Sequence, residues 1–286
     1  MDPMPELPEV ETIARGVHKR VSGQRIVDVW FASHPQPFKT PARRQARELE
    51  GRTFLAVHRT GKHIVCELGS GLDESSGSSG GKKPAAQWIV HLGMTGSLLI
   101  SAPDAPIEIH THARLSLSGG KELRFVDPRR FGRLEFRDLG RTKAFSAAGL
   151  EPLTVSPREF AALFHGRRLS IKAALLNQAL LTGVGNIYAD ESLFRAGIRP
   201  RKSAGRLTRV ELERLRLALL QVLRDAIRLG GSSVSDYVDA DGVRGFFQLE
   251  HCVYQRTGLP CRRCQTPIRR ILVAGRGTHF CPQCQR

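Results

Sequence analysis

The sequence lacks the features that would place a protein in or across a membrane. No run of about eighteen apolar residues occurs in it, so no membrane-spanning helix is expected. The chain does not open with a basic stretch followed by an apolar core, which is the pattern of a secretory signal. A lipidation motif and a long basic amphipathic helix at a terminus are also missing. We therefore expect a soluble, cytoplasmic protein.

Acidic residues are scarce as well. The sequence has 27 of them against 44 lysines and arginines, which gives a formal net charge of +17 at pH 7. So large an excess favours a polyanionic partner, most often nucleic acid, over basicity that serves solubility alone. The shortage is complete in residues 251–286, which contain seven arginines and no acidic residue. This last segment is predicted to form a nucleic-acid-binding surface.

Cysteine is infrequent, but four of the six cysteines form a metal-binding pattern. Two Cys-x-x-Cys pairs are separated by sixteen residues and consist of Cys261, Cys264, Cys281 and Cys284. This spacing is typical of a tetrathiolate zinc site in which a hairpin joins two tight turns. Two disulfides are the alternative, which the missing secretory signal disfavours. Because four thiolates leave no open coordination position, we expect one structural Zn²⁺ ion.

Hydrophobic periodicity changes near the middle of the chain. The first half contains a helix over residues 7–21 and then short strands between turns, which is typical of a β-sandwich or barrel. The predicted strands span residues 25–32, 52–58, 64–68, 87–92, 96–101, 112–117 and 122–126. The second half is predicted to be helical over residues 156–164, 171–181, 187–196 and 208–229. The fold class is therefore α+β, with two domains.

Two segments are rich in glycine and polar residues and contain little to bury. Residues 69–86 form a Gly/Ser-rich insertion, which we interpret as a flexible hairpin loop without a function of its own. Residues 231–245 are also predicted to form a mobile loop.

The residues after Met4 read Pro-Glu-Leu-Pro-Glu-Val and could supply a nucleophile. Proline at a free N-terminus is an amine that loses its proton at roughly pH 8, so Pro5 could attack an aldehyde-like carbon and form an iminium. Glu6 and Glu9 could move protons beside it. The alternative is that Pro5 is a turn residue and both glutamates are first-turn helix acids. Since residues 1–4 precede Pro5, the chemistry requires a start at Met4 with removal of that methionine, or other trimming.

Five stretches, in matching order and spacing, resemble bacterial formamidopyrimidine-DNA glycosylase. They are MPELPEVET at residues 4–12, HLGMTG at 91–96, DPRRFG at 127–132, GVGNIYADE at 183–191 and the four-cysteine hairpin. The resemblance runs from Met4 to the C-terminus and is interrupted by the insertion. It implies a monomeric, bifunctional DNA glycosylase and abasic-site lyase. Such an enzyme removes oxidised purines, 8-oxoguanine and formamidopyrimidines among them, from double-stranded DNA.

The resemblance also implies a domain organisation. An N-terminal catalytic β-sandwich with a flanking helix would span residues 4–148. A helix–two-turns–helix DNA-binding domain would span residues 149–250, and a zinc-finger β-hairpin residues 251–286. A bacterial enzyme of this kind would work in the cytoplasm and associate with the nucleoid through DNA.

The catalytic residues implied by the resemblance are three N-terminal residues and one lysine. Pro5 would attack C1′ of the damaged nucleotide, expel the base and leave an iminium, whose positive charge promotes β- and then δ-elimination. Glu6 would act as the acid and base at the sugar, and Glu9 would support the amine. Lys62 would hold the phosphate beside the lesion from a strand. The alternative for Lys62 is a solvated hairpin lysine.

A second implied group contacts DNA. A target base must leave the stack before it can react, and inserted side chains offset the cost of unstacking. Met94, Arg129 and Phe131 match the family's wedge, and Arg129 could also hydrogen-bond the orphaned cytosine. A lone methionine or phenylalanine is more often part of a core. The remaining matches to DNA-contacting positions are His91, Lys172, Asn186 and Arg276.

Two alternatives and three departures accompany the resemblance. Endonuclease VIII shares the nucleophile but prefers oxidised pyrimidines. Leu7 in place of glycine favours the purine-specific type, as does the long segment 231–245, which in the resembled family closes over an extruded 8-oxoguanine. The departures are the residues before Met4, the insertion at 69–86, and Asp190, where the family often has serine. The alternative from another class is a catalytically silent protein that binds damaged DNA, which a blocked N-terminal amine would produce.

Overall fold

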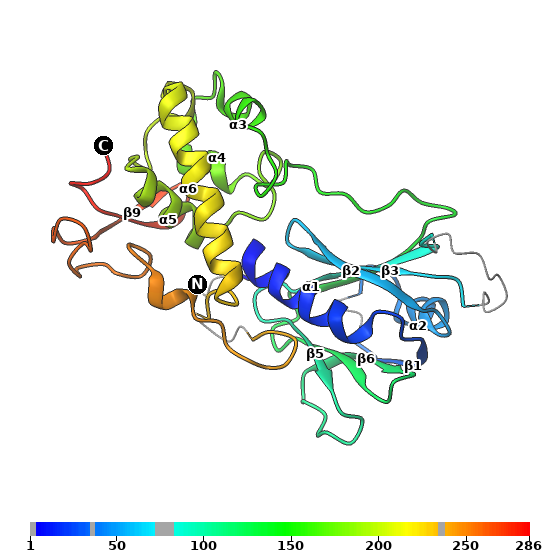
Figure 1. Cartoon of the computed structure of the whole chain (residues 1–286). Coiled ribbons are helices and arrows are strands. Elements are labelled where there is room, and N and C mark those ends of the chain that lie inside the picture. The colour runs from blue at the N-terminus through cyan, green and yellow to red at the C-terminus, as the bar shows by residue number, and fades with distance from the viewer. Residues whose placement is uncertain (1–3, 35–37, 72–82, 234–237) are drawn as a thin grey trace. The chain divides into compact units, whose positions relative to one another are not determined.

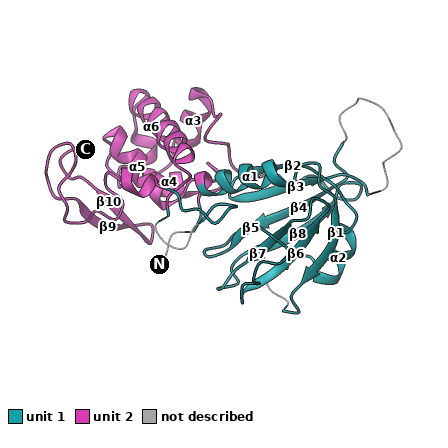
Figure 2. Ribbon diagram, turned by 60° about the horizontal axis from the view of Figure 1, so that its bottom comes forward, with its two compact units in different colours: residues 1–5, 9–146, 233–245 teal, residues 6–8, 147–232, 246–286 magenta. Residues whose placement is uncertain are grey.

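A computed structural model describes the chain except for residues 1–3, 35–37, 72–82 and 234–237 (Figure 1). The chain divides into two compact units (Figure 2). Unit 1 comprises residues 1–5, 9–146 and 233–245, and unit 2 comprises residues 6–8, 147–232 and 246–286. Unit 1 holds most of the strands and unit 2 most of the helices, so the predicted fold class is confirmed.

Two four-stranded sheets make up the strands of unit 1. The first has the order β1 (Ile26–Phe31), β6 (Thr111–Leu117), β7 (Glu122–Val126) and β5 (Ser97–Ser101). The second has the order β2 (Phe54–Thr60), β3 (His63–Leu68), β4 (Ala86–His91) and β8 (Arg133–Asp138). All neighbouring strands in both sheets are antiparallel. The predicted strands are all present, and β8 is an addition to them.

The two sheets share one hydrophobic core, to which α1 (Leu7–Val21) contributes its apolar face. Val10, Ile13 and Val17 recur at helical spacing and are almost wholly buried. They belong to the same cluster as Trp88 of the second sheet and Phe125 of the first. Removal of this apolar surface from water is what holds the sandwich together.

One further helix of unit 1, α2 (Ala42–Leu49), is mostly polar and was not among the predicted elements. Its Gln45 is nevertheless wholly buried. The side-chain amide of Gln45 donates to the Thr40 carbonyl oxygen (2.7 Å), and its Oε1 accepts from Nε1 of Trp88 (3.1 Å). Because both ends of the amide are paired, this buried polar group fixes α2 on the second sheet.

Helices and a C-terminal hairpin form unit 2. The helices are α3 (Pro157–Phe164), α4 (Ile171–Leu176), α5 (Asn186–Ala196) and α6 (Arg209–Arg228), with the short 3-10 turns η1 (Ala204–Arg206) and η2 (Phe247–Glu250). The hairpin pairs β9 (Arg269–Val273) with β10 (Arg276–Phe280). Nearly every side chain of α5 is buried, so this helix lies at the centre of the unit. Within the described residues, no helix combines sufficient length with sufficient hydropathy to span a bilayer.

Side-chain hydrogen bonds set the helix boundaries in unit 2. Ser156 and Glu159 form the predicted capping box at the start of α3, and α6 begins with the same motif. Helix α4 ends at Leu176, five residues earlier than predicted. The reason is that Asn177 takes an extended backbone and its Oδ1 accepts from the amide of Ala179 (3.0 Å), which competes with helix continuation.

The two segments predicted to be flexible lie partly outside the described residues. The insertion at 69–86 falls mostly on residues 72–82, and the segment 231–245 includes residues 234–237. Neither prediction is tested there.

The described end of the second segment is anchored within unit 1. Ala240 is buried, and a Cβ added to Gly16 of α1 would lie only 3.1 Å from its Cβ. The Ala240 carbonyl oxygen accepts from the amide of Ile100 on β5 (2.9 Å). Arg20 of α1 forms an ion pair with Asp241. The segment is thus attached to both α1 and β5.

Candidate active site and nucleic-acid interface

Glu6 is the most firmly held of the predicted catalytic residues. It is 3% exposed, and its carboxylate accepts from the backbone amides of Ile187 (3.0 Å) and Tyr188 (3.4 Å). Both amides lie in the first turn of α5, where unpaired N–H groups and the helix dipole favour negative charge. Gly185 permits this approach, because a Cβ there would lie 2.2 Å from Glu6 Cδ. The carboxylate therefore acts as the cap of α5 and is fixed directly after Pro5.

Pro5 and Glu9 are also buried. Glu9 is the acidic residue of the first turn of α1. The amide of Leu7 donates to the carbonyl oxygen of Gly183 (3.0 Å), in the glycine-rich turn before α5. Gly183 has a φ of +85°, and a Cβ there would lie 2.9 Å from Leu7 Cβ, so glycine is required on both grounds. The start of α1 is thus held on this turn by its backbone.

Lys62 lies in the two-residue turn between β2 and β3 and not on a strand as predicted. Gly61, the other turn residue, has a φ of +62°, which glycine adopts without strain. Arg59 holds this turn, since its Nη1 donates to the Gly61 carbonyl oxygen (3.1 Å) and its Nε to Glu11 of α1 (2.9 Å). The position of Lys62 is therefore tied to α1 through a buried arginine.

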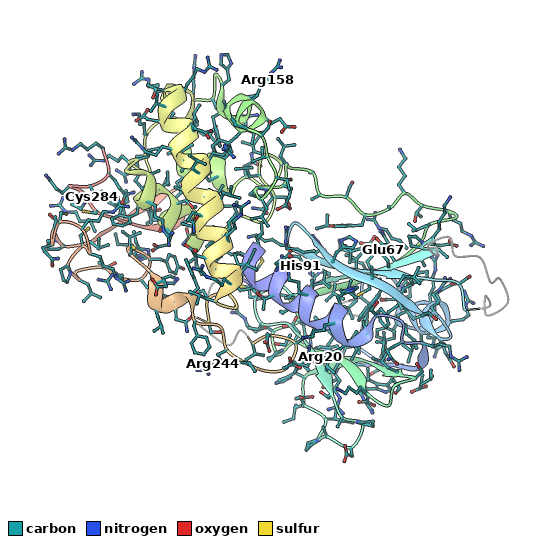
Figure 3. All side chains as sticks on the ribbon, viewed as in Figure 1. Arg20, Glu67, His91, Arg158, Arg244 and Cys284 are labelled. Atoms are coloured by element: carbon teal, nitrogen blue, oxygen red, sulfur yellow. The ribbon has the colours of Figure 1, made fainter. Side chains whose placement is uncertain are left out.

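His91 ends β4 (Figure 3). Its ring is arranged as a neutral hydrogen-bond donor. Its Nδ1 accepts from the amide of Gly93 (3.2 Å), and this bond assigns the ring hydrogen to Nε2. Burial, with the nearby charges of His63 and Lys62, lowers the pKa of His91 to about 4. The neutral ring can therefore offer the same Nε2–H to a phosphate oxygen at neutral and at mildly acidic pH.

A shallow cavity of about 210 Å³ adjoins His91, and its lining is rich in nitrogen-bearing side chains. His63, His91 and Arg133 are register partners on β3, β4 and β8, so they form a row across the second sheet. Lys39 lines the same cavity. This row extends the donor-rich surface that begins at Lys62.

The predicted wedge residues lie on two loops of unit 1. Met94 is in the turn between β4 and β5, and Arg129 and Phe131 are in the loop between β7 and β8. The guanidinium carbon of Arg129 lies 4.8 Å from the centroid of the Phe131 ring, a cation–π arrangement. Phe131 is 47% exposed, so the alternative that it is a core residue does not apply.

Lys172 is buried among groups of α5 and β10, and its predicted DNA contact stays a prediction. Its side chain is wholly buried, with Nζ 2.7 Å from Asp190 Oδ1. The same Nζ donates to the Gly277 carbonyl oxygen (3.1 Å) and to Thr278 Oγ1 (2.8 Å). Burial lowers the pKa of Lys172, and the negative charges of Asp190 and Glu6 oppose this shift. Asp190, one of the departures from the family pattern, is the residue that holds Lys172 inside.

Asn186 and Arg276 are connected through the hairpin. Nδ2 of Asn186 donates to the carbonyl oxygen of Gly277 (3.0 Å), which is the oxygen that Lys172 also contacts. Arg276 precedes Gly277, begins β10 and is exposed. Helices α4 and α5 therefore fix the strand that presents Arg276.

The four predicted ligands form a cluster that fits a zinc ion. The sulfur atoms of Cys261, Cys264, Cys281 and Cys284 all lie within 4.8 Å of one another. Zn–S bonds of about 2.3 Å in a tetrahedron require S–S separations of about 3.8 Å. Two separations here are 3.4 and 3.9 Å. The amides of Arg263 and Cys284 each donate to a sulfur at 3.4 Å, which would stabilise thiolates.

Two buried carboxylates of the site are absent from the sequence-based predictions. Asp127 is wholly buried in the loop that carries Arg129. Glu191 accepts from the amides of residues 252–254 at 2.8–2.9 Å, and burial raises its pKa. The sequence offers one sign of their importance, which is that each lies inside a stretch that carries the family resemblance.

Comparison with known proteins covers almost the whole chain. Residues 4–134 match the family model described as the formamidopyrimidine-DNA glycosylase N-terminal domain. Residues 149–238 match the formamidopyrimidine-DNA glycosylase H2TH domain, and residues 258–286 match a zinc finger found in FPG and IleRS.

Relatives and solved structures agree with these matches. A formamidopyrimidine-DNA glycosylase of Solibacter usitatus is 44% identical over 283 residues, which cover 99% of this chain and 100% of that protein. A Lactococcus lactis FPG mutant in complex with Fapy-dG containing DNA has a TM-score of 0.85 at 34% identity, covering 99% of this chain and 100% of that one. The complex of Lactococcus lactis Fpg with abasic site containing DNA has a TM-score of 0.84 at 35% identity, covering 98% and 99%.

Proposed function

Because the chain belongs to the formamidopyrimidine-DNA glycosylase family, we propose that it excises oxidised purines from damaged double-stranded DNA and then cuts the strand as an abasic-site lyase. Complexes of the Lactococcus lactis relative with Fapy-dG containing DNA and with abasic site containing DNA support both steps. The observation that carries the proposal is the carboxylate of Glu6, held by two amides of α5 directly after Pro5.

In this proposal the amine of Pro5 is the nucleophile. Its nitrogen bonds to C1′ of the damaged nucleotide as the bond from C1′ to the base breaks, and the base leaves with the electron pair and takes up a proton. Opening of the sugar ring and loss of the amine proton give an iminium. Because the iminium withdraws electrons, a proton leaves C2′ and the 3′ phosphate departs. Loss of a further proton then releases the 5′ phosphate.

The carboxylates move protons in these steps. Glu6 donates a proton to the sugar oxygen as the ring opens and accepts protons in the eliminations, because its fixed position beside Pro5 keeps it in reach. Glu9, buried one turn further along α1, supports the amine. Neither role requires a metal ion.

DNA is held by residues of both units in this proposal. Lys62 and His91 bind the phosphate beside the lesion, and Asn186 and Arg276 bind phosphates through the helix–hairpin connection described above. Lys172 acts indirectly by holding the hairpin. The three wedge residues occupy the gap that the extruded base leaves. A bound zinc ion supplies a cross-link between the two ends of the hairpin and takes no part in the reaction.

Three consecutive parts of the chain have different roles in this proposal. Residues 4–148 carry the nucleophile and the wedge, residues 149–250 hold DNA, and residues 251–286 form the zinc hairpin. The protein would act as a monomer on chromosomal DNA in the bacterial cytoplasm. Light scattering of the complex checks the monomer and should give one protein per damaged duplex.

Pro5 can act only as a free N-terminus. The match to the N-terminal family model begins at residue 4, which supports a start at Met4 followed by removal of that methionine. Residues 1–3 lie outside both this match and the described part of the structure.

Borohydride trapping on a duplex with a natural abasic site, paired with the intact mass of the protein, tests the nucleophile. We expect a covalent adduct on a chain that begins at Pro5, because borohydride reduces the iminium to a stable amine. A duplex with tetrahydrofuran at the same position is the matched control, since it has no aldehyde. No adduct from a chain that begins at Pro5 would overturn the mechanism. If the purified chain retains Met1, the test is repeated after residues 1–4 are removed.

The lesion class is tested separately. Turnover should be faster on an 8-oxoguanine:C duplex than on a matched thymine-glycol duplex. The opposite ranking would favour the pyrimidine-specific alternative. Binding to an abasic analogue with no cutting of a natural abasic site would favour the silent damage-binding protein.

A further inference from the structure

The two loops that carry the wedge residues are in direct backbone contact. Gly93 lies in the turn that bears Met94, and its φ is +66°. A Cβ on Gly93 would lie 2.5 Å from the carbonyl carbon of Phe131 and 2.5 Å from the amide nitrogen of Gly132. Only a residue without a side chain fits at this point. The turn 93–96 and the loop 127–132 are therefore packed backbone to backbone within unit 1.

The carboxylate of Asp127 connects the two loops. Its Oδ1 accepts from Thr95 Oγ1 of the turn (2.6 Å) and from the amide of Arg129 (3.3 Å), while Oδ2 accepts from the amide of Gly132 (2.7 Å). The Thr95 hydroxyl oxygen also accepts from the Arg129 amide (3.3 Å). Asp127 is wholly buried, and all these donors are uncharged. Hydrogen bonds to a buried carboxylate are among the strong ones in proteins.

The backbone of this loop includes a strained conformation that side-chain hydrogen bonds support. Arg130, between the two wedge residues of the loop, has a φ of +57°, a conformation that residues with a side chain rarely adopt. Arg133 holds the second half of the loop, because its Nη1 donates to the carbonyl oxygens of Arg130 (3.3 Å) and Gly132 (2.6 Å). Asp127 and Arg133 thus secure the loop from its buried and its outer side.

We propose that Asp127 is a positioning residue that sets Met94 of one loop against Arg129 and Phe131 of the other, and so assembles the wedge. The inference rests on the proposed function, because it assumes that the three side chains fill the gap in a damaged duplex. Thr95 shares this role through its hydroxyl group. Neither residue touches DNA in this account. Each acts through the backbone that presents the wedge.

The sharpest variants are at Thr95, because they change one hydroxyl and leave the carboxylate in place. Thr95→Val keeps the shape of the side chain but removes the donor to Asp127, whereas Thr95→Ser keeps that donor. Thr40→Val is the matched control. It removes a hydroxyl of unit 1 that likewise bonds backbone groups, those of Phe136. Asp127→Asn, which replaces one acceptor oxygen by a donor, is the stronger change.

Two readouts separate positioning from stability. Strand cutting is compared on an abasic site in a duplex and in a single strand, where no stacked gap has to be filled. We expect Thr95→Val to lower kcat/KM about tenfold on the duplex and less than about twofold on the single strand, and Asp127→Asn to lower the duplex value further. Thr95→Ser should restore the duplex value, and Thr40→Val should leave the ratio of the two substrates unchanged.

Fluorescence of 2-aminopurine placed opposite a tetrahydrofuran site reports wedge insertion without any chemistry. The wild-type protein should raise this fluorescence on binding, and Thr95→Val should raise it less. Equal losses on both substrates, or an unchanged fluorescence signal in Thr95→Val, would overturn the role of Asp127. A wild-type protein that raises the fluorescence but cuts neither substrate would overturn the lyase activity and leave the positioning role intact.

Discussion

The two units hold their functional backbone segments with buried carboxylates of different character. In unit 1, Asp127 accepts from backbone amides and one hydroxyl, all uncharged. In unit 2, Asp190 is paired with the ammonium group of Lys172 and also accepts from the amide of His279 on β10 (2.8 Å). Both members of that ion pair are wholly buried. A buried carboxylate thus fixes a backbone segment in each unit, through uncharged donors in unit 1 and through an ion pair in unit 2.

The difference predicts how each unit responds to loss of a partner. Loss of an uncharged donor from Asp127 forfeits a hydrogen bond to a charged group, which contributes about 1.5–3 kcal/mol. Loss of Asp190 leaves a lysine charge buried without its counter-ion, which costs about 3–5 kcal/mol. We therefore expect unit 1 to lose local order in its loops while its fold persists, and unit 2 to lose global stability.

Zinc removal should produce the largest difference in stability between the two units. Structural zinc contributes about 10–16 kcal/mol in zinc-finger peptides, so a chelator should unfold the hairpin β9–β10. Both tryptophans, Trp30 and Trp88, lie in unit 1, and their fluorescence should be unchanged. Hydrogen exchange should show loss of protection in the hairpin and in α4, which Lys172 joins to it. DNA binding should weaken at the same time.

Metal analysis provides the control for this prediction. One zinc per chain is expected before chelation. Normal DNA binding by a protein with negligible zinc would show that the structural zinc is not needed for the interface.

Asp190→Ala should have the next largest effect. We expect it to lower the free energy of unfolding by about 3–5 kcal/mol in urea denaturation, because the buried Lys172 ammonium group loses the carboxylate that offsets its desolvation. The double variant Asp190→Ala with Lys172→Met should recover much of this loss. Asp241→Ala, which breaks the half-exposed pair with Arg20, is the matched control and should cost less than about 1 kcal/mol. Equal costs for the two single variants would contradict the comparison.

Acidification should change the free energy of unfolding least, and the change should be measurable in unit 1. Burial lowers the pKa of His63 and of His91 from 6.5 to about 4. Between these values the unfolded chain binds more protons than the folded one, so the stabilisation present above pH 6.5 is lost as pH falls toward 4. We expect roughly 1–2 kcal/mol per histidine after allowance for partial exposure. Urea unfolding followed by tryptophan fluorescence at several pH values measures this slope.

Variants at the two histidines give the control. His63→Gln and His91→Gln should each flatten the pH dependence of unit 1 between pH 6.5 and 4. His251 of unit 2, whose pKa burial also lowers to about 4, should leave that slope unchanged when it is replaced. A slope that survives both unit 1 variants would show that other groups set it.

Much of the fold could be predicted because its signals are local. Alternation and short apolar runs located every strand of the two sheets except β8, and Ser156 with Glu159 located the start of α3. The spacing of the cysteines identified the metal site, since two Cys-x-x-Cys pairs on one hairpin bring four sulfur atoms to a single point. By contrast, α2 was missed although Ala42, Ala46 and Leu49 recur at helical spacing, because most of its residues are polar. Its position depends on hydrogen bonds of Gln45, one of them to Trp88, which is distant in the sequence.

The site was less predictable because it depends on which groups face one another. Nothing local distinguishes Lys172, which is buried, from Lys62, which lies in a turn. The burial of Lys172 depends on Asp190, eighteen residues later, and on the hairpin. The role of Asp127 could not be predicted either. Its carboxylate accepts from three donors, and the sequence does not distinguish it from a solvated aspartate in a turn.

The attachment of Ala240 to Ile100 has a consequence for solubility. Strand β5 is the outermost strand of its sheet, and such edges offer unpaired N–H and C=O groups to strands of other molecules. The Ala240 carbonyl oxygen occupies one of these donors, and Ala240 itself is buried there. Residues 238–245 therefore also cover part of an edge that could pair with other molecules. Deleting them should promote intermolecular β-pairing even where DNA plays no part.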